Sequence, residues 1–276
     1  MAKILDGKLV AQKIKNEIKS ACANKDIKLT IFQVGDNLAS NTYVRNKQKA
    51  CDEVGLESEV IKLAANDYTE ERGLWKHITN CTSDALMVQL PLPYSWDEHL
   101  YLNYIDANKD ADCLTDEALG KFYSSNKPSI APCTAQGIID LLDYYNIPIE
   151  GKHAVVVGRS NIVGKPVAHL LTCRNATVTL CHSRTENLSE FTRRADILVV
   201  AIGQPKYITG DMIKDGAVVI DVGINRNKEG KLCGDVDFDS VKEKALAITP
   251  VPGGVGPMTI AELLKNTIKL YNNNTK

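Results

Sequence analysis

Hydrophobic and polar positions alternate in two periods along the first half of the chain. Leu9, Val10, Ile14 and Ile18 recur at helical spacing and predict an amphipathic helix over residues 6–23. Short β-rich runs separated by helical patterns follow, which is typical of α/β units built on parallel strands. We expect strands at 29–34, 58–63 and 85–90, and helices at 69–80 and at 40–54, the latter ending at Gly55.

The second half repeats this alternation from about residue 151. A short apolar strand at 153–157 runs through a glycine-containing loop into a helix at 166–173. Pro257 suits the first turn of a last helix, 257–271, because its missing N–H would have no partner there. Further strands are expected at 177–181, 197–202, 217–222 and 246–249, with a turn at 225–231. A helix from 132 to 145, with Thr134 as N-cap, lies at the seam between the halves, 131–151.

Composition narrows the class of protein. The 276 residues are 44% hydrophobic, and 33 Lys and Arg balance 34 Asp and Glu. This near-neutral charge argues against a strongly basic nucleic-acid binder. The longest apolar run, 197–202, is far shorter than the ~20 residues of a membrane helix. Eight scattered cysteines without a Cys-x-x-Cys pair, and an N-terminus that fits no signal peptide, favour the cytoplasm.

A glycine-rich turn follows the strand at 153–157. The strand runs into Gly158, a tight turn and then Gly164, which opens a helix. That geometry presents backbone N–H groups and a helix N-terminus to a pyrophosphate. Ser160 replaces the middle glycine of the usual Gly-x-Gly-x-x-Gly, and one residue is added. A strand–turn–helix that binds nothing is the alternative interpretation.

The next strand indicates which dinucleotide would bind. An NAD-binding chain usually carries Asp or Glu ~20 residues after the glycines. Here the strand at 177–181 runs into His182, Ser183 and Arg184. Ser183, Arg184 and Arg159 together form a cationic, hydroxyl-bearing niche suited to a 2′-phosphate. The pattern favours NADP over NAD, and solvated loop residues are the alternative.

Candidate catalytic side chains lie in the first half. Tyr43 and Lys47 are i and i+4 and share a helix face, so a planar ligand could stack on the ring while the ammonium polarises it. A surface lysine over a tyrosine is the alternative. Gln89 lies at the carboxyl end of an apolar strand, where α/β sheets place ligand groups, and a hydrogen-bonded strand-end amide is the alternative. Pro91 and Pro93 end that strand.

Two further segments carry polar chemistry. Asp110 and Asp112 suggest calcium, but Thr115 and Lys121 stand where an EF-hand needs Gly and Glu, so we expect no metal. Asp112 could instead accept two hydrogen bonds from an aminopyrimidine edge, or cap a loop. Residues 249–259 form a second glycine-rich turn that offers backbone N–H groups to an anion or a polar ring.

These motifs together resemble the bifunctional methylenetetrahydrofolate dehydrogenase / methenyltetrahydrofolate cyclohydrolase family. The resemblance spans nearly the whole chain, and the proline–glycine block is its most specific part. In chain order the motifs are Tyr43-x-x-x-Lys47, residues 88–93 (VQLPLP), 109–112 (KDAD), 132–134 (PCT), 158–166 (GRSNIVGKP) and 250–259 (PVPGGVGPMT).

The resemblance implies two reactions. Hydride passes from 5,10-methylenetetrahydrofolate to NADP, and water then opens the methenyl cation to 10-formyltetrahydrofolate, a one-carbon donor for purine biosynthesis. Lys47 would act in the hydrolysis, Gln89 would hold Lys47, Tyr43 would stack on the folate and Asp112 would grip the pterin. Pro252, Gly253 and Gly254 would line the folate site. The expected cofactor contacts are Gly158, Arg159, Ser160, Gly164, Ser183, Arg184 and Ile224.

The resemblance also implies the architecture. We expect two three-layer α/β domains around a cleft, the second Rossmann-like with a mostly parallel sheet. Residues 1–130 plus 257–276 would form the folate-binding catalytic domain, and 131–256 the NADP-binding domain. The enzyme would be a homodimer with a small-molecule substrate and neither nucleic-acid nor membrane partner.

One departure and three alternatives remain. The family usually has Asp-Gly where this chain has Asp112-Cys113, so a positive φ at that position would strain Cys113. The first alternative is a dehydrogenase alone, against which Lys47 argues. The second is a shikimate-dehydrogenase-like enzyme, which would not need the block at 250–259. The third is a non-catalytic nucleotide sensor.

Overall fold

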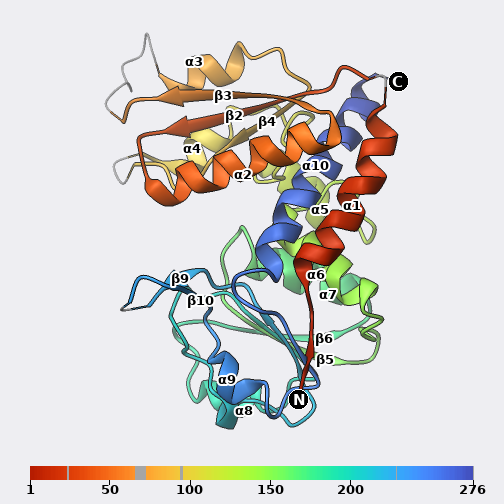
Figure 1. Ribbon diagram of the computed structural model, residues 1–276, viewed down its shortest axis with the longest axis vertical. Helices are drawn as coiled ribbons and strands as arrows, with labels where there is room; N and C mark the ends of the chain where they lie inside the picture. The colour runs from red at the N-terminus through yellow and green to blue at the C-terminus, as the bar shows by residue number, and fades with distance from the viewer. Residues whose placement is uncertain (24, 66–72, 94–95, 228, 276) are drawn as a thin grey trace. The chain divides into compact units, whose positions relative to one another are not determined.

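The structure, a computed structural model, describes residues 1–23, 25–65, 73–93, 96–227 and 229–275 (Figure 1). The chain forms two compact α/β units, each with its own parallel sheet. The three-stranded unit comprises Lys13–Ala131 and Ile260–Lys276, and the six-stranded unit comprises Met1–Gln12 and Pro132–Thr259.

The three-stranded unit is built on a buried central strand. β2 (Lys28–Val34) pairs in parallel with β3 (Glu57–Leu63) on one side and β4 (Ala85–Val88) on the other. Its residues after Lys28 are all buried, as expected of a strand covered on both faces. Figure 1 shows α2 (Leu38–Val54) and α3 (Leu74–Thr79) on opposite faces of this sheet. The other helices with residues in this unit are α1 (Gly7–Cys22), α4 (Glu98–Leu102), α5 (Asp116–Tyr123) and α10 (Val255–Asn274).

Helix α2 carries the predicted catalytic pair and has well-formed ends. The Asn37 side chain accepts hydrogen bonds from the backbone N–H groups of Ala39 and Ser40, which caps the first turn. Gly55 adopts the left-handed conformation at the C-terminus, with a φ of 80°. The predicted stop at Gly55 is therefore confirmed, whereas the helix starts two residues before the predicted Ser40 because Asn37 supplies the cap.

The six-stranded unit has a doubly wound sheet. Its strand order is β1-β11-β8-β7-β5-β6, and all these pairs are parallel. β5 continues to β6 on one side and lies beside β7 on the other, so the strand order reverses at the carboxyl ends of β5 and β7. Open α/β sheets bind ligands at such a point. The strands are β1 (Lys3–Ile4), β5 (His153–Val157), β6 (Thr177–Cys181), β7 (Ile197–Val200), β8 (Val218–Asp221) and β11 (Ala247–Ile248).

Helices cover both faces of this sheet. Figure 1 shows α6 and α7 on one face and α8 and α9 on the other. The core includes Val155, Leu198 and Val219 from the central strands, each fully buried. The remaining elements are α6 (Cys133–Tyr144), α7 (Gly164–Cys173), α8 (Leu188–Thr192), the 3-10 turn Gly210–Met212, α9 (Phe238–Val241), and the antiparallel hairpin β9 (Asn225–Arg226) and β10 (Leu232–Cys233).

The compact units differ from the predicted domains at the N-terminus. Residues 1–12 belong to the six-stranded unit, because β1 pairs with β11 and the Leu5 N–H donates to the Ile248 carbonyl at 2.9 Å. A strand of two residues is too short to show a periodic pattern. At the other end Ile260–Lys276 belongs to the three-stranded unit, and α10 starts at Val255.

Two local predictions also change. Thr134 is not an N-cap: Pro132 occupies that position without a side-chain hydrogen bond, and the Thr134 hydroxyl shares a hydrogen bond of 3.1 Å with the Thr259 hydroxyl. The predicted helix at 69–80 falls partly outside the described residues, within which α3 covers Leu74–Thr79. The predicted turn at 225–231 lies within the β9–β10 hairpin, and its residue 228 is outside the described residues.

Candidate active site

Lys47 and Gln89 meet in the three-stranded unit. Lys47, on α2, is 6% exposed, and its Nζ donates a hydrogen bond of 3.0 Å to Gln89 Oε1. Gln89 follows β4, and its Nε2 donates to the Leu90 carbonyl at 2.7 Å. This second hydrogen bond directs the amide so that its oxygen faces the lysine. The two residues that the family resemblance implies to act together are thus in direct contact.

The ammonium group of Lys47 has neutral partners. Besides Gln89 it lies 3.4 Å from the Met87 sulfur, and it forms no ion pair with a described residue. A carboxylate partner would neutralise the ammonium, whereas a neutral amide holds it and leaves its charge to act on a ligand. This arrangement suits a cation that polarises a bound molecule or orients water.

Tyr43 lies one helical turn before Lys47, and Ser40 lies nearly two turns before it. Tyr43 is half-buried, and this burial raises the pKa of its hydroxyl. Ser40 is 4% exposed, and its Oγ has no hydrogen-bond partner among the described residues. Ser40, Tyr43 and Lys47 occupy positions i, i+3 and i+7, which share one helix face. Sequence reasoning missed Ser40, although this spacing was available to find it.

Asp110, two residues before the predicted pterin-binding Asp112, is a buried structural carboxylate. It is 1% exposed, and its Oδ2 accepts hydrogen bonds of 2.7 Å from the N–H groups of both Leu114 and Thr115. Burial raises the pKa of Asp110 to about 6. Asp110 therefore shapes the loop from which the half-buried Asp112 extends.

Cys113 adopts the strained conformation that its replacement of a glycine implies. Its φ is 57°, in the left-handed region, and the side chain is fully buried. Its Sγ lies 3.9 Å from the Ile130 carbonyl oxygen, and burial raises the pKa of the thiol. The loop thus keeps a backbone shape that favours glycine, at a cost to Cys113 of roughly 1–2 kcal/mol. The thiol is protonated and inaccessible.

In the six-stranded unit the predicted cofactor turn requires its two glycines. Gly158 has a φ of 124°, and a Cβ there would lie 2.2 Å from the Ala201 carbonyl oxygen. A Cβ at Gly164 would lie 2.0 Å from the Gly158 carbonyl oxygen. The Ser160 Oγ accepts hydrogen bonds from the N–H groups of Val163 and Gly164, at 3.1 and 3.4 Å. The hydroxyl that replaces the middle glycine therefore supports the start of α7.

The predicted 2′-phosphate residues lie at one edge of the sheet. Val157 and Cys181 are paired neighbours in β5 and β6, so Arg159 and Arg184 follow adjacent strand ends. Both arginines and Ser183 are exposed, and neither guanidinium forms an ion pair with a described residue. Ile224, beyond the end of β8, is 48% exposed.

The proline–glycine block packs backbone against backbone on the start of α1. The Gly253 carbonyl accepts hydrogen bonds from the N–H groups of Gly7 and Lys8, at 3.0 and 3.2 Å. A Cβ on Gly7 would lie 1.8 Å from the Gly254 carbonyl oxygen. Pro252 is exposed, whereas Gly253 and Gly254 are buried. Gly253 and Gly254, which the sequence suggested for a ligand site, therefore also allow the backbone of this block to pack closely on the start of α1.

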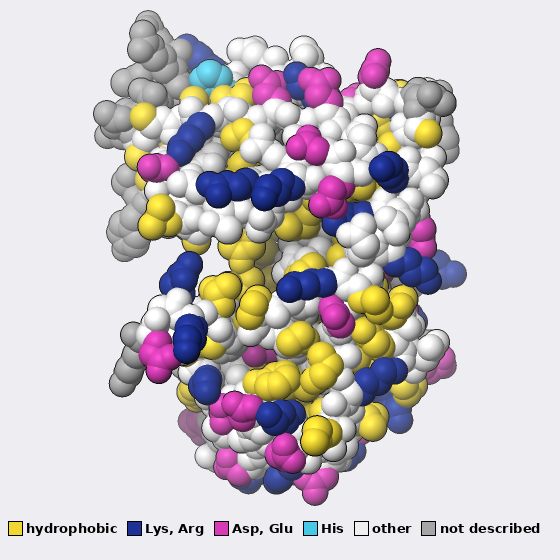
Figure 2. All heavy atoms as spheres, in the orientation of Figure 1, with side chains coloured by type: hydrophobic (Ala, Val, Ile, Leu, Met, Phe, Trp, Pro, Cys, Tyr) yellow, Lys and Arg dark blue, Asp and Glu magenta, His cyan; other side chains and the backbone are white. Residues whose placement is uncertain are grey.

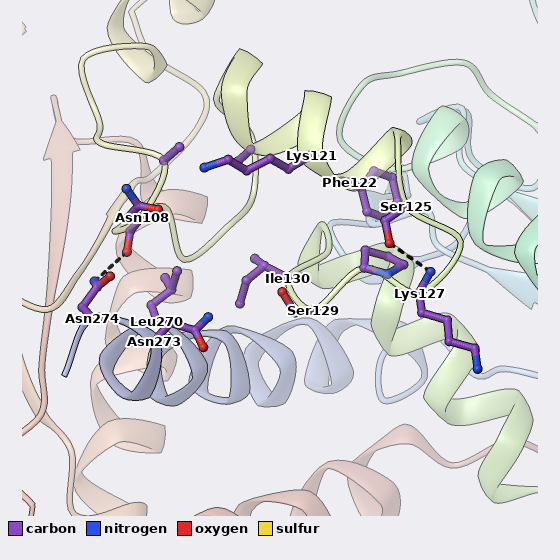
Figure 3. A pocket seen from close by; sticks show the side chains of 13 residues that line it. Asn108, Lys121, Phe122, Ser125, Lys127, Ser129, Ile130, Leu270, Asn273 and Asn274 are labelled. Carbon is purple, nitrogen blue, oxygen red and sulfur yellow. Dashed lines mark hydrogen bonds between the residues drawn. The ribbon is translucent and has the colours of Figure 1, made fainter. Parts of the chain in front are cut away.

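A hollow of about 300 Å³ lies elsewhere in the three-stranded unit, between α5, the following loop and the end of α10 (Figure 3). Phe122, Ile130 and Leu270 contribute apolar surface to it, with Asn108 and Asn273 beside them. None of the predicted site residues lines it.

Charge and metal-binding groups are dispersed. On the face shown in Figure 2, basic and acidic side chains are interspersed over both units. The described residues contain no group of three or more His, Cys, Asp or Glu placed to hold a metal ion. Within the same residues, no helix combines the length and the apolar character that crossing a bilayer requires.

Together these features define a class of protein. A doubly wound parallel sheet with a glycine turn at its carboxyl edge is typical of nucleotide-dependent dehydrogenases. Arg159 and Arg184, which form no ion pair with a described residue, follow the same edge. The three-stranded unit contributes the buried Lys47, whose ammonium group is held by the Gln89 amide. Comparison with known families identifies the particular member of this class: residues 132–275 match the NAD(P)-binding domain of tetrahydrofolate dehydrogenase/cyclohydrolase, and residues 5–112 match its catalytic domain. The chain belongs to this family.

Individual relatives agree. The chain is 50% identical to the bifunctional protein FolD of Agathobacter rectalis over 98% of this chain and 99% of the relative. The crystal structure of the FolD dehydrogenase/cyclohydrolase of Campylobacter jejuni matches with a TM-score of 0.93 at 43% identity, covering 99% and 100% of the two chains. The FolD enzyme of Trypanosoma brucei, solved with NADP and an inhibitor, matches at 0.93 and 38%, covering 100% and 99%.

The predicted class of enzyme is thereby confirmed. The chain is a bifunctional dehydrogenase and cyclohydrolase of one-carbon folate metabolism. This family assignment overturns the shikimate-dehydrogenase-like and sensor alternatives.

Proposed function

We propose that the chain oxidises 5,10-methylenetetrahydrofolate with NADP and hydrolyses the methenyl product to 10-formyltetrahydrofolate, with Lys47 as the central residue of the hydrolysis. The observation that carries this proposal is the buried Lys47 ammonium, held by the Gln89 amide and free of any carboxylate among the described residues.

Hydrolysis needs a water oxygen to add to the methenyl carbon and to lose its protons. The bond from that carbon to N5 then breaks and N5 takes up one proton, which leaves the formyl group on N10. Lys47 can polarise the folate or orient the water, and Gln89 sets the direction of its Nζ through the 3.0 Å hydrogen bond. Tyr43, one turn away on α2, offers a ring on which the folate can stack. The unpartnered Ser40 hydroxyl lies on the same helix face and is available to the same ligand.

The expected folate contacts lie in two loops, one with Asp112 and one with residues 252–254. Asp112 extends from the loop that Asp110 fixes, so its carboxylate can accept two hydrogen bonds from the pterin edge. Pro252, Gly253 and Gly254 remain predicted folate contacts. The exposed ring of Pro252 supports such a contact, whereas the Gly253 carbonyl is already used by the start of α1.

We infer that the dinucleotide is NADP. When bound, NADP accepts the hydride, and this chain contributes binding and orientation to that step. The turn from Gly158 to Gly164 would hold the pyrophosphate, and Ile224 would contact the cofactor. Arg159, Ser183 and Arg184 would hold the 2′-phosphate, which is supported by their exposure and by the two unpaired guanidinium groups. The absence of an acidic residue at 182–185 also favours NADP over NAD.

We further propose that the enzyme is a cytoplasmic homodimer whose product supplies purine biosynthesis. The cytoplasmic assignment is supported by the eight cysteines, all described and all free thiols, as expected in a reducing compartment. The dimer follows from the family resemblance.

The test is Lys47→Met, assayed directly on 5,10-methenyltetrahydrofolate by the decay of its absorbance. We expect hydrolysis to be abolished while NADP binding, measured by titration, stays at the wild-type level. Lys49→Met, on an exposed lysine of the same helix, is the matched control and should hydrolyse normally. Hydrolysis retained by Lys47→Met would remove the central assignment.

A further inference from the structure

Two buried carboxylates lie at the carboxyl edge of the six-stranded sheet, outside every predicted site. Asp221 ends β8 and is 3% exposed, and Asp235, which follows β10, is fully buried. Neither forms an ion pair with a described residue. Burial raises the pKa of Asp221 to about 7. Both side chains accept hydrogen bonds from N–H donors of the described residues, so they hold the chain in place rather than neutralise a cation.

Asp235 joins two loops that follow neighbouring strands. Its Oδ2 accepts hydrogen bonds from the N–H groups of Ile202 and Gly203, at 2.7 and 3.0 Å, in the turn beyond β7. Its Oδ1 accepts a hydrogen bond of 2.8 Å from the Asn225 side chain, beyond β8. One side chain thus fixes both loops relative to each other.

Asp221 in turn holds Asp235. Its Oδ1 accepts hydrogen bonds from the N–H groups of Asp235 and Gly223, at 2.9 and 3.0 Å, and its Oδ2 accepts one of 3.0 Å from Val236. The backbone at Asp235 is therefore fixed to the end of β8.

The loops held by Asp235 border the predicted cofactor residues. Gly158 is in close contact with the turn beyond β7, since a Cβ on it would lie 2.2 Å from the Ala201 carbonyl oxygen. Ile224 stands between Gly223 and Asn225, which bond to Asp221 and Asp235 respectively.

The strand order indicates which end of the dinucleotide would lie against these loops. The pyrophosphate turn follows β5, and the residues for the 2′-phosphate follow β6, on one side of it. The nicotinamide end must therefore extend to the other side, over the ends of β7 and β8.

We propose that Asp235, oriented by Asp221, is a positioning residue that fixes the nicotinamide end of the dinucleotide through the turn at 202–203 and Asn225. This inference rests on the proposed use of NADP. It assigns Asp235 no contact with the reacting atoms.

The test compares two probes, NADP and adenosine 2′,5′-bisphosphate, which carries only the adenosine end. Asp235→Asn replaces one accepting oxygen by an NH2 group and removes the negative charge, which weakens the hydrogen bonds from Ile202, Gly203 and Asn225. We expect the Kd for NADP to rise about tenfold or more, with a matching rise in KM. The Kd for the bisphosphate and the hydrolysis of 5,10-methenyltetrahydrofolate should stay within about twofold of wild type.

Controls separate positioning from loss of folding. Asp239→Asn changes an exposed carboxylate of α9 and should leave both Kd values unchanged. Asn225→Ala removes only the hydrogen bond from the loop beyond β8 to Asp235. If Asp235→Asn does not fold, Asn225→Ala is the variant that tests the proposal. It should weaken NADP alone, in the same direction.

The outcomes distinguish this inference from the proposed function. Wild-type protein that binds neither probe would refute the NADP assignment itself. Wild-type protein that binds both, with a variant that keeps its NADP affinity or loses both affinities equally, would overturn the positioning role of Asp235.

Discussion

The buried Asp110 carboxyl makes the stability of the protein depend on pH. Burial raises its pKa to about 6, above the value of about 3.9 in an unfolded chain. The folded state therefore favours the protonated form. The resulting stability is fully present below the unfolded pKa and is lost as the pH rises through the folded pKa.

The magnitude follows from the difference between the two pKa values. A shift of about two units corresponds to roughly 3 kcal/mol over the whole titration, at about 1.4 kcal/mol per unit. Between pH 4.5 and 7.5 the part lost is about 2 kcal/mol. The two main-chain hydrogen bonds to Oδ2 already act against the shift, so the pKa of about 6 includes them.

Asp110→Asn removes this titration and keeps an oxygen that can accept from Leu114 and Thr115. We expect the difference in unfolding free energy between wild type and variant to change by about 2 kcal/mol from pH 4.5 to 7.5, in favour of the variant at the higher pH. Urea unfolding at both pH values measures it, with Asp26→Asn as an exposed carboxyl-to-amide control. An identical pH dependence in wild type and Asp110→Asn would refute the reasoning.

Two further predictions follow from close packing. Cys113 should resist iodoacetamide in the native protein while the half-buried Cys233 reacts, as read by peptide mass spectrometry, and equal labelling of both would contradict the buried, protonated thiol. Gly7→Ala should lower the free energy of unfolding by about 2–4 kcal/mol, because its Cβ would lie 1.8 Å from the Gly254 carbonyl oxygen. Thermal unfolding measures this loss, and an unchanged Tm would show that the block does not pack on α1 as described.

Periodicity could predict the elements whose burial repeats along the chain. The β-rich run of β2, the apolar run of β5 and the helical spacing in α1 are visible in the sequence alone, and the structure confirms all three within a residue or two. β1 has no such signal, since its partner lies more than 240 residues away and only two residues pair. Periodicity therefore could not predict that the N-terminal segment pairs with the six-stranded sheet.

Local spacing could likewise predict candidate catalytic residues on one helix, but not contacts between residues that are far apart in the sequence. Tyr43 and Lys47 follow from one helix, whereas the contact of Lys47 with Gln89 joins α2 to the end of β4 across 42 residues. Only the family resemblance suggested that pairing. The positive φ at Cys113 also follows from the resemblance, since the thiol itself gives no sign of the backbone conformation.

The buried carboxylates escaped prediction for a different reason. An aspartate in a loop has the same sequence signal whether it is solvated or receives main-chain hydrogen bonds. Yet each unit uses one beside its predicted ligand loop, Asp110 next to Asp112 and Asp235 next to the segment that carries Ile224. A carboxylate can accept several N–H donors at once, so a single side chain can fix a loop that contains no regular hydrogen-bond ladder. The cost is the burial of a carboxyl group. The two amide variants therefore test different consequences: Asp110→Asn should gain stability relative to wild type as the pH rises from 4.5 to 7.5, whereas Asp235→Asn should weaken NADP binding.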